Sequence, residues 1–519
     1  MRKNRSGEVG ILARGILGGA MLVALLLLTS CAHKPAPNTL VMIIESSPTN
    51  LDPRVGLDGQ SERIDALLFD NLLTVNEHLS VAPGLAESWQ IANPTTYIFH
   101  LRKGVQFADG RPLTSRDVKW SFDSLLEGKI RSTKGATYRF VDHIDAPDDY
   151  TVIFHLKQPW AALLWNVAGG GGMGIVPYGS GSDFNQHPIG SGPFRFVSAE
   201  QDKEVIIERN DNYWGRKANL ARARFAVVPD TTTRALELRK GSADLVINAL
   251  PPDMVFALQR DTPLQVLRGP GTVLAYMGFN LRDPILKDVR VRQAIAYALN
   301  RERYLRYVWP FARLAASVLP PESWAYDPDV THYSYDPARA RELLDQAGYK
   351  AVNGVRFHLT MKTSTEESSR TMAAVFQQQL HDVGIALDIR SFEFATFLSD
   401  VTHGEFQVYS LRWIGGNEDP DFFDYAFSTS RIIPNGANRQ YYSNPRVDAL
   451  IAQASGELNQ KVRKRDYDEI QQILAQDLPY VDLWYFDNVL VYSRRVRGLE
   501  LNPSGNYDFL RTAELANSR

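Results

Sequence analysis

Strand-like and helix-like segments alternate along most of this 519-residue sequence, which contains no internal repeats. Residues 96–107 and 150–157 carry apolar side chains at every second position, the spacing of a strand that buries one face. Between them, residues 112–128 open with a Thr-x-x-Asp capping pattern and continue with apolar residues at helical spacing. From about residue 285 to 400, helix-like segments are each followed by a strand-like run. This alternation predicts an α/β fold.

Two further helices have clear boundaries in the sequence. The pair Asp336-Pro337 is a good N-cap and first-turn combination, and Gly348 is expected to end that helix. A second helix is expected to end at Gly384 in the same way. Each is followed by a strand-like run, so this half of the chain is predicted to form a sheet that makes one wall of a cleft.

The first 30 residues have the features of an export signal. Basic residues precede an uncharged, largely apolar run, Gly15–Ser30, which is shorter than the roughly 20 residues that cross a bilayer as a helix. The run ends at Leu28-Thr29-Ser30-Cys31, which resembles the bacterial lipobox. This resemblance implies that residues 1–30 are removed and that Cys31 is acylated. An uncleaved membrane anchor with an incidental cysteine is the alternative.

The composition of the remaining chain narrows the classes of partner. Cys31 is the single cysteine, so the chain forms no internal disulfide. Residues 31–38 are polar and proline-containing and are predicted to be a tether. Without residues 1–30 the chain holds 53 basic against 58 acidic residues, because the signal contains four basic residues and one acidic residue. This mild acidity argues against a nucleic-acid partner.

No motif predicts a metal site, a cofactor or an enzyme. The ten histidines show no H-E-x-x-H pattern and no close pair, and there is no C-x-x-C. The acidic run 418–424 lacks the alternation and central glycine of an EF-hand loop. The glycines of residues 168–177 are not followed by the Lys-Ser/Thr of a phosphate loop, and no G-x-S-x-G elbow occurs. A hydrolase that uses the carboxylates of residues 418–424 remains the alternative from another class.

Seven segments in order resemble a known family, the extracellular solute-binding proteins of the peptide and nickel transport group. These proteins are the ligand receptors of ABC importers. The segments cover most of the chain after residue 30, which makes the resemblance much more specific than one motif would be. They are residues 85–127, 188–197, 208–220, 230–246, 279–302, 335–349 and 442–454.

The resemblance implies a two-lobed periplasmic-binding-protein fold of type II with an additional inserted domain. The implied lobe I combines residues 36–65, 188–270 and 487–519, the inserted domain is residues 66–187, and lobe II is residues 271–486. The segments that connect the lobes would act as hinges, so the ligand would be bound by closure of the lobes.

A ligand site in the cleft is also implied. In peptide-binding members, an aspartate three residues after a tryptophan pairs with the α-amino group of the ligand. Here the tryptophan is Trp413 and the aligned position is Gly416, so the usual anchor is absent. Glu418 or Asp419 can take over from a shifted position. The expected ligand-binding residues are Ser46, Ser47, Arg412, Trp413, Ile414, Gly415, Gly416, Asn417, Arg439 and Tyr441.

Two of these assignments leave alternatives open. Arg412 can hold a ligand carboxylate or form a salt bridge within its own lobe. Residues 436–442, with Asn438 as a further candidate, can line the cleft or form a surface loop.

The resemblance predicts a lipid-anchored solute receptor, without enzymatic activity or cofactor, in the periplasm or at the cell surface. It would be a monomer that captures a peptide or peptide-like solute and delivers it to an ABC permease and its ATPase subunits. Because the usual anchor is missing, a metal chelate, an oligosaccharide or an opine-type compound is an alternative solute. A sensing role on the same fold is also open, and the sequence does not distinguish the inner from the outer membrane.

Overall fold

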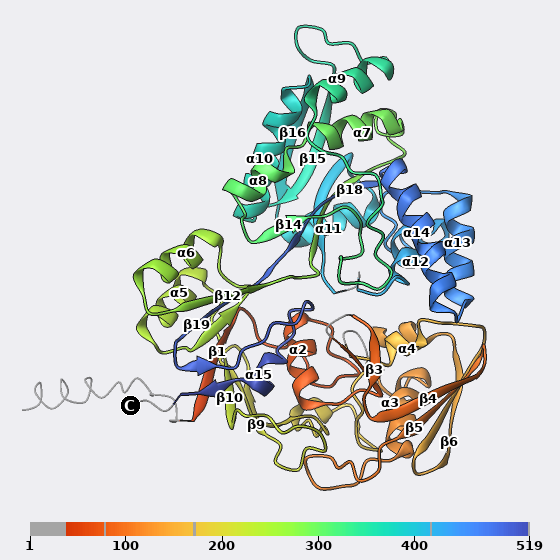
Figure 1. Ribbon diagram of the computed structural model, residues 1–519, viewed down its shortest axis with the longest axis vertical. Coiled ribbons are helices and arrows are strands. Elements are labelled where there is room, and N and C mark those ends of the chain that lie inside the picture. Colours follow the sequence, from red (N-terminus) through yellow and green to blue (C-terminus); the bar gives the residue numbers. More distant parts are fainter. Residues whose placement is uncertain (1–37, 77–78, 170–172, 416–417, 517–519) are drawn as a thin grey trace, which may run out of the picture.

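The protein has an upper lobe and a lower body, seen in Figure 1, and the α/β fold expected from the sequence is confirmed. The upper lobe comprises residues 274–486, and the lower body comprises the described residues before 270 and after 487. The computed structural model describes residues 38–76, 79–169, 173–415 and 418–516. Cys31, the signal and most of the tether lie outside the described residues, as do Gly416 and Asn417.

A seven-stranded sheet forms one half of the lower body. Its central strand β1 is apolar at five of six positions and buried along its whole length, because both faces of the sheet are covered. Helices α5 (Thr231–Lys240) and α6 (Pro252–Asp261) cover one face, and α2 (Gly59–Leu68) packs on the other. In order, the strands are β12 (Gln265–Gly269), β19 (Asn488–Tyr492), β11 (Leu245–Ile247), β1 (Thr39–Ile44), β10 (Arg222–Val227), β9 (Glu204–Arg209) and β8 (Phe194–Glu200).

A four-stranded antiparallel sheet forms the other half of the lower body. Its buried face carries the alternating apolar residues predicted from the sequence and packs against α3 (Ser115–Leu126). The predicted capping box is confirmed, because the Thr114 N–H donates to the Asp117 carboxylate over 2.8 Å. In order, the strands are β4 (Ala86–Asn93), β5 (Thr96–Leu101), β7 (Thr151–Leu156) and β6 (Val141–Asp148). The short strands β2 (Leu73–Val75) and β3 (Val81–Pro83) and helix α4 (Leu163–Asn166) lie beside it.

The upper lobe is built on a mixed six-stranded sheet. In order, the strands are β14 (Ala312–Leu314), β18 (Tyr480–Phe486), β13 (Leu274–Phe279), β17 (Val408–Trp413), β15 (Phe357–Ser364) and β16 (Ile385–Phe392). Its helices are α7 (Val289–Ala298), α8 (Arg301–Tyr307), α9 (Pro337–Gln346), α10 (Glu367–His381), α11 (Phe394–His403), α12 (Phe422–Phe427), α13 (Pro445–Gly456) and α14 (Gln460–Asp477). The predicted N-cap at Asp336 is confirmed, and Gly348 and Gly384 follow their helices with positive φ.

The strands of each sheet come from one predicted domain. The seven-stranded sheet uses the segments assigned to lobe I, the four-stranded sheet uses residues 66–187, and the six-stranded sheet uses residues 271–486. The exact domain boundaries stay a prediction.

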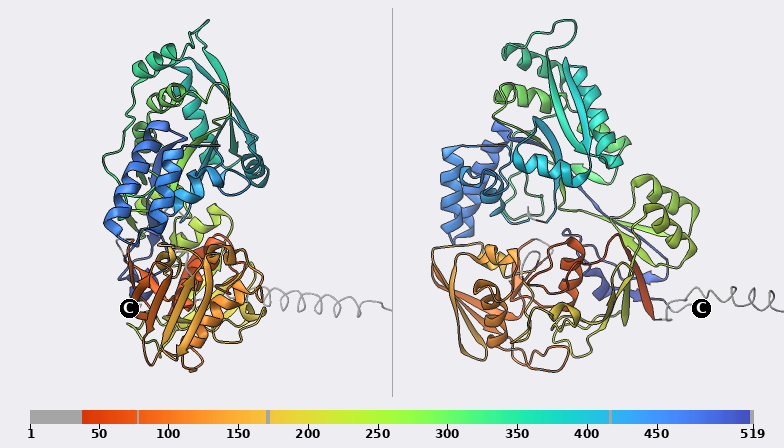
Figure 2. Two further views of the ribbon diagram at one scale, coloured as in Figure 1. Left: turned by 90° about the vertical axis from the view of Figure 1, so that its right-hand side faces the viewer. Right: turned by 180° about the vertical axis from the view of Figure 1, so that it is seen from behind.

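Two crossing segments join the lower body to the upper lobe. Residues 270–273 connect β12 to β13, and Asp487 connects β18 to β19. The right-hand view of Figure 2 shows these connections running between the two parts. A Cβ at Gly271 would lie 2.3 Å from the Phe486 carbonyl oxygen, so a glycine is needed where the two segments pass each other. Any rotation between the two parts has to occur at these segments.

The two parts also touch away from the crossing segments. The Ala161 N–H, beside α4, donates to the carbonyl of Ser455 in α13 over 2.9 Å. Pro159 lies against Gly456 at the same place. The parts therefore meet at two separated places.

A buried ion pair connects several segments within the lower body. Arg54 has an exposed fraction of 0%, and its guanidinium lies 2.7 Å from the carboxylate of Asp52. It also donates to the Ser124 hydroxyl in α3 and to the carbonyls of Ser180 and Gly181. This one side chain therefore links segments far apart in the sequence.

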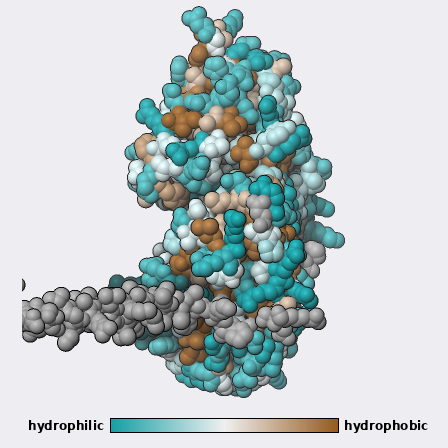
Figure 3. Space-filling view, turned by 90° about the vertical axis from the view of Figure 1, so that its left-hand side faces the viewer, coloured by the Kyte–Doolittle hydropathy of each residue, from teal (hydrophilic) through white to brown (hydrophobic). Residues whose placement is uncertain are grey.

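The surface is mostly polar on the face shown in Figure 3, where apolar residues are scattered among hydrophilic ones. Among the described residues, no helix has the length and apolar character needed to span a bilayer.

Candidate ligand-binding site

A cavity of about 250 Å³ lies where the lower body meets the upper lobe. Most of its walls come from the lower body: the end of α2 and the residues after it, β2, β3, the pair Tyr213 and Trp214, and residues 502–511. Glu418 reaches it from the upper lobe. The cavity is therefore shared by the two parts that the crossing segments connect.

Acidic groups outnumber basic groups in this cavity. Its lining carries the carboxyl groups of Asp70, Glu418 and Asp508 and the guanidinium of Arg511. Burial raises the pKa of Asp508, and the nearby charge of Arg511 opposes this shift. A solute with a positive charge is therefore better suited to this space than an anion.

Asp70 is held by three donors of the lower body. The Trp214 indole N–H donates to it over 2.8 Å, the Ser191 hydroxyl over 3.0 Å and the Tyr213 hydroxyl over 3.1 Å. Burial raises the pKa of Asp70 to about 6, although the three hydrogen bonds lower it. Both oxygens are used within the protein, so Asp70 contributes negative potential to the cavity rather than a free ligand.

Glu418 lines the cavity from the upper lobe, whereas Asp70 belongs to the lower body. Its side chain is 2% exposed, and Oε1 accepts a hydrogen bond of 2.8 Å from the Thr272 hydroxyl. Thr272 belongs to a crossing segment, so the loop of the upper lobe is tied to the connection between the two parts. Burial raises the pKa of Glu418 to about 7, and the Thr272 hydrogen bond opposes this shift. A buried carboxylate of this kind gains strongly from a cation beside it.

The four carboxylates of the acidic run do not form one site. Asp419 accepts from the N–H of Asp421 over 2.8 Å and so closes a turn. Asp421 interacts with Trp160 of the lower body, and Asp424 pairs with Arg431 over 2.7 Å. Burial raises the pKa of Asp419 to about 7, although the charge of Arg463 lowers it. Among the described residues, only Glu418 of this run lines the cavity.

Trp413 and Arg439, two of the expected ligand-binding residues, are in contact. The Trp413 ring stacks on Tyr276 with centroids 5.5 Å apart, and the Arg439 guanidinium carbon lies 4.8 Å from the Trp413 ring. Arg439 also donates to the Tyr276 hydroxyl over 3.0 Å. Trp413, Tyr276 and Arg439 therefore form one packed cluster in which both aromatic rings are buried.

Arg412 forms the salt bridge within its own lobe that the sequence left as one of two alternatives. Its guanidinium lies 3.6 Å from the Glu366 carboxylate and donates to the Ser368 hydroxyl over 3.2 Å. Its guanidinium carbon is 4.7 Å from the ring of Phe486. These partners all belong to the upper lobe, and the Arg412 side chain stays 38% exposed.

The remaining described candidates are spread out. Ser46 is exposed, and Ser47 accepts a hydrogen bond of 2.7 Å from the backbone of Asp202. Ile414 is 67% exposed, and Gly415 has a φ of +75°. None of these four residues lines the cavity.

The structure separates Tyr441 from Trp413. The Arg282 guanidinium carbon lies 3.3 Å from the Tyr441 ring, at the end of the β13–β17 pair opposite to Trp413. Asn438 is fully buried, and its amide bonds to backbone groups of Phe427, Ser428 and Tyr442. Asn438 therefore stabilises its own loop and does not face the cavity.

Sequence reasoning missed most of the cavity lining in the lower body. Asp70, Arg511 and the residues around Asn506 were not expected there. The available signal was the segment 208–220, which resembles a family block and contains Tyr213 and Trp214.

Comparison with known proteins identifies the family that the seven sequence segments resemble. The family model for bacterial extracellular solute-binding proteins, family 5 Middle, matches residues 80–435. The chain is 27% identical to the dipeptide-binding protein of Escherichia coli over 521 residues, which cover 95% of this chain and 96% of that protein. It is 28% identical to heme-binding protein A of Haemophilus influenzae, with 92% of each chain covered.

A solved structure extends the comparison to the fold. The oligopeptide-binding protein AppA from Bacillus subtilis, in complex with a nonapeptide, superposes with a TM-score of 0.75. The match covers 92% of this chain and 99% of that chain, with 26% sequence identity.

Proposed function

Because the chain belongs to the bacterial extracellular solute-binding proteins of family 5, we propose that it captures a peptide or peptide-like solute between its two parts and delivers it to an ABC permease. The family consists of transport receptors rather than enzymes. The observation that carries the proposal is the acid-lined cavity to which Glu418 contributes from across the boundary between the two parts.

A peptide is favoured over the other solutes considered. The relatives include dipeptide-binding and oligopeptide-binding proteins, and one solved relative holds a nonapeptide. A peptide also carries the positive α-amino group that the cavity's excess of carboxyl groups would attract. A metal chelate, an oligosaccharide or an opine-type compound has less support from these observations.

We propose that Glu418 replaces the missing anchor at Gly416. Glu418 lies two residues further along the same loop, and its carboxyl group is buried and lines the cavity. Burial disfavours the ionised form of Glu418, and the ammonium group of a bound peptide would stabilise that form.

The direct test of the proposed function is native mass spectrometry of the mature protein, followed by calorimetric titration with the peptides identified. We expect a monomer that carries one peptide, and micromolar or tighter affinity after the peptide is removed and returned. A different co-purified compound, with no heat from any dipeptide or tripeptide, would contradict the peptide assignment while leaving the family intact.

We further propose that the mature protein is attached to a membrane through a lipid on Cys31. The support is the lipobox-like end of the signal, which lies outside the described residues. Metabolic labelling with palmitate is expected to mark the wild-type protein and to leave a Cys31→Ala variant unlabelled and released from membranes. Equal labelling of both proteins would contradict this proposal.

A further inference from the structure

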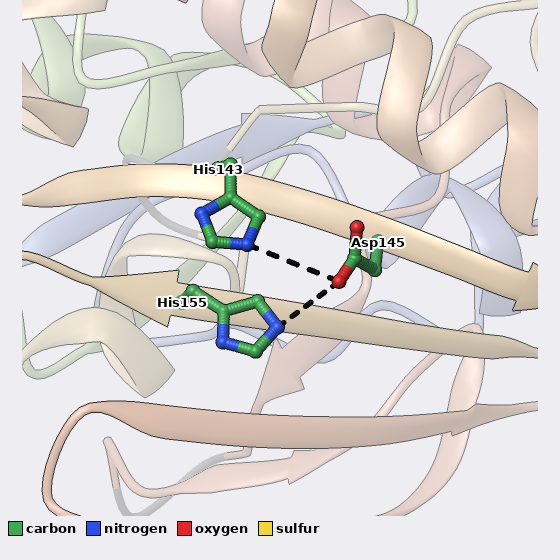
Figure 4. Close-up of side chains that lie close together, drawn as sticks. All are labelled: His143, Asp145 and His155. Atoms are coloured by element: carbon green, nitrogen blue, oxygen red, sulfur yellow. Dashed lines mark ion pairs between the residues drawn. The ribbon is translucent and has the colours of Figure 1, made fainter.

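Two histidines and an aspartate lie together on the exposed face of the four-stranded sheet. His143 in β6 pairs directly across the sheet with His155 in β7, and Asp145 follows two residues later on the same face. The imidazole rings are stacked, with centroids 4.3 Å apart and planes 10° from parallel. Figure 4 shows both rings turned toward Asp145. The close histidine pair that the sequence did not reveal is thus formed by strand pairing.

The donor atoms converge on one point. Asp145 Oδ2 lies 3.2 Å from Nε2 of His155 and 3.9 Å from Nε2 of His143, and one ligand atom from each residue fits within 4.8 Å of the other two. Ligands that bind zinc tetrahedrally at about 2.0–2.1 Å stand roughly 3.3–3.5 Å apart. Rotation about the side-chain bonds that unstacks the two rings would bring the three atoms to coordination distance.

The environment of His143 favours metal binding. Its Nδ1 lies 2.8 Å from the Asp142 carboxylate. An ionised carboxylate can only accept hydrogen bonds, so this contact favours a proton on Nδ1. The hydrogen bond from Nδ1 to Asp142 leaves Nε2, which lies 3.9 Å from Asp145 Oδ2, as the ring nitrogen that is free to bind an ion. Metal-binding histidines are commonly oriented by such a second carboxylate. The exposed fractions of His143, His155 and Asp145 are 53%, 31% and 57%, so an ion can enter from solvent and keep water ligands.

We propose that His143, Asp145 and His155 bind one divalent transition-metal ion, for which Zn²⁺ is the probe. The donor set of two imidazoles and one carboxylate is typical of Zn²⁺ and of related ions. None of the three residues lines the cavity that contains Glu418, so the site is separate from the proposed solute site. It does not depend on the identity of the solute.

The position of the site gives the ion a structural role. β6 is an edge strand of its sheet, and its register with β7 shifts on both sides of the His143–Asp145 stretch. An ion bound by residues of both strands would hold β6 against β7 between these two register shifts. Because an ion that binds the folded state stabilises it, bound Zn²⁺ is expected to raise the melting temperature.

The test uses the mature protein, prepared without an affinity tag and treated with a chelator. Titration with Zn²⁺ against a chromophoric chelator is expected to show one site per chain. The His155→Ala variant is expected to bind Zn²⁺ at least tenfold more weakly, and Asp142→Asn about tenfold more weakly. His381→Ala, which removes an exposed histidine of the upper lobe, serves as the matched control and is expected to change nothing.

Co²⁺ provides an independent readout. Bound to the wild-type protein it is expected to give visible absorption bands that are lost in a His143→Ala, His155→Ala double variant. If the double variant and the wild type bind Zn²⁺ with the same affinity and give the same Co²⁺ spectrum, the three residues form only a surface ion pair and the proposal is wrong.

Discussion

Replacement of Glu418 by glutamine is expected to weaken the binding of a dipeptide at least a hundredfold at pH 8. The proposed partner of Glu418 is the peptide ammonium, and loss of one partner of a buried charge pair costs about 3–5 kcal/mol. Each 1.4 kcal/mol corresponds to about a tenfold change in affinity. Isothermal titration calorimetry of the Glu418→Gln variant with the peptide found in the wild-type protein measures this effect.

The matched control is Asp424→Asn in the same acidic run. Asp424 pairs with Arg431 and does not line the cavity, so this variant is expected to bind the peptide as the wild type does. Equal affinities of the Glu418→Gln and Asp424→Asn variants would show that Glu418 is not the anchor. Loss of binding in both variants would point instead to damage to the shape of the loop.

The pH dependence of binding provides a second check on Glu418. Burial raises its pKa to about 7 in the free protein, so below pH 7 the carboxyl group must lose a proton before it can pair with an ammonium. The affinity of the wild-type protein is therefore expected to fall about tenfold per pH unit below 7. The Glu418→Gln variant is expected to lack this component, since glutamine does not titrate.

The stability of the free protein separates this effect from misfolding. Because the folded pKa of Glu418 is raised above the usual value of 4.5, its favourable contribution is present below about pH 4.5 and is lost as the pH rises through 7. At pH 8 the empty Glu418→Gln variant is therefore expected to be at least as stable as the wild type. A variant that binds peptide poorly yet resists urea equally well would meet both expectations.

Replacement of Arg54 by methionine is expected to lower the free energy of unfolding by about 3–5 kcal/mol. Methionine fills similar space but leaves the buried Asp52 carboxylate without its partner, which is the costly way to break a buried pair. It also removes the links to Ser124, Ser180 and Gly181. Urea unfolding followed by tryptophan fluorescence measures the change.

The matched control for Arg54 is Arg290→Met. Arg290 pairs with Asp288 over the same 2.7 Å and with the same two-residue spacing, but these side chains are 45% and 24% exposed. An exposed pair contributes less than about 1 kcal/mol, so the control is expected to have a small effect. Similar losses in both variants would mean that burial does not decide the importance of the Arg54 pair.

Local features of the fold could be predicted from the sequence. The alternating residues 96–101 and 151–156 form neighbouring strands, and the capping box at Thr114 starts a helix. The helix that begins after Asp336 also starts as expected. These features depend on side-chain spacing over a few residues, which is visible without knowledge of the fold.

The candidate site was less predictable because side-chain direction within a loop depends on distant partners. The sequence presents Glu418, Asp419, Asp421 and Asp424 as one acidic run. In the structure, Thr272 bonds to Glu418, while Trp160 and Arg431 interact with Asp421 and Asp424. Thr272 and Trp160 come from distant parts of the chain, so no local pattern could single out Glu418.

The α/β class, several helix and strand boundaries and the resemblance to the solute-binding family could all be predicted without the structure. Each of these follows from local periodicity or from ordered motifs along the chain. The position of Glu418 in the shared cavity and the meeting of His143, Asp145 and His155 on one face became visible in the folded chain alone. The physical reason is that strand pairing and contact between the two parts bring together side chains whose separation along the chain carries no signal of their proximity.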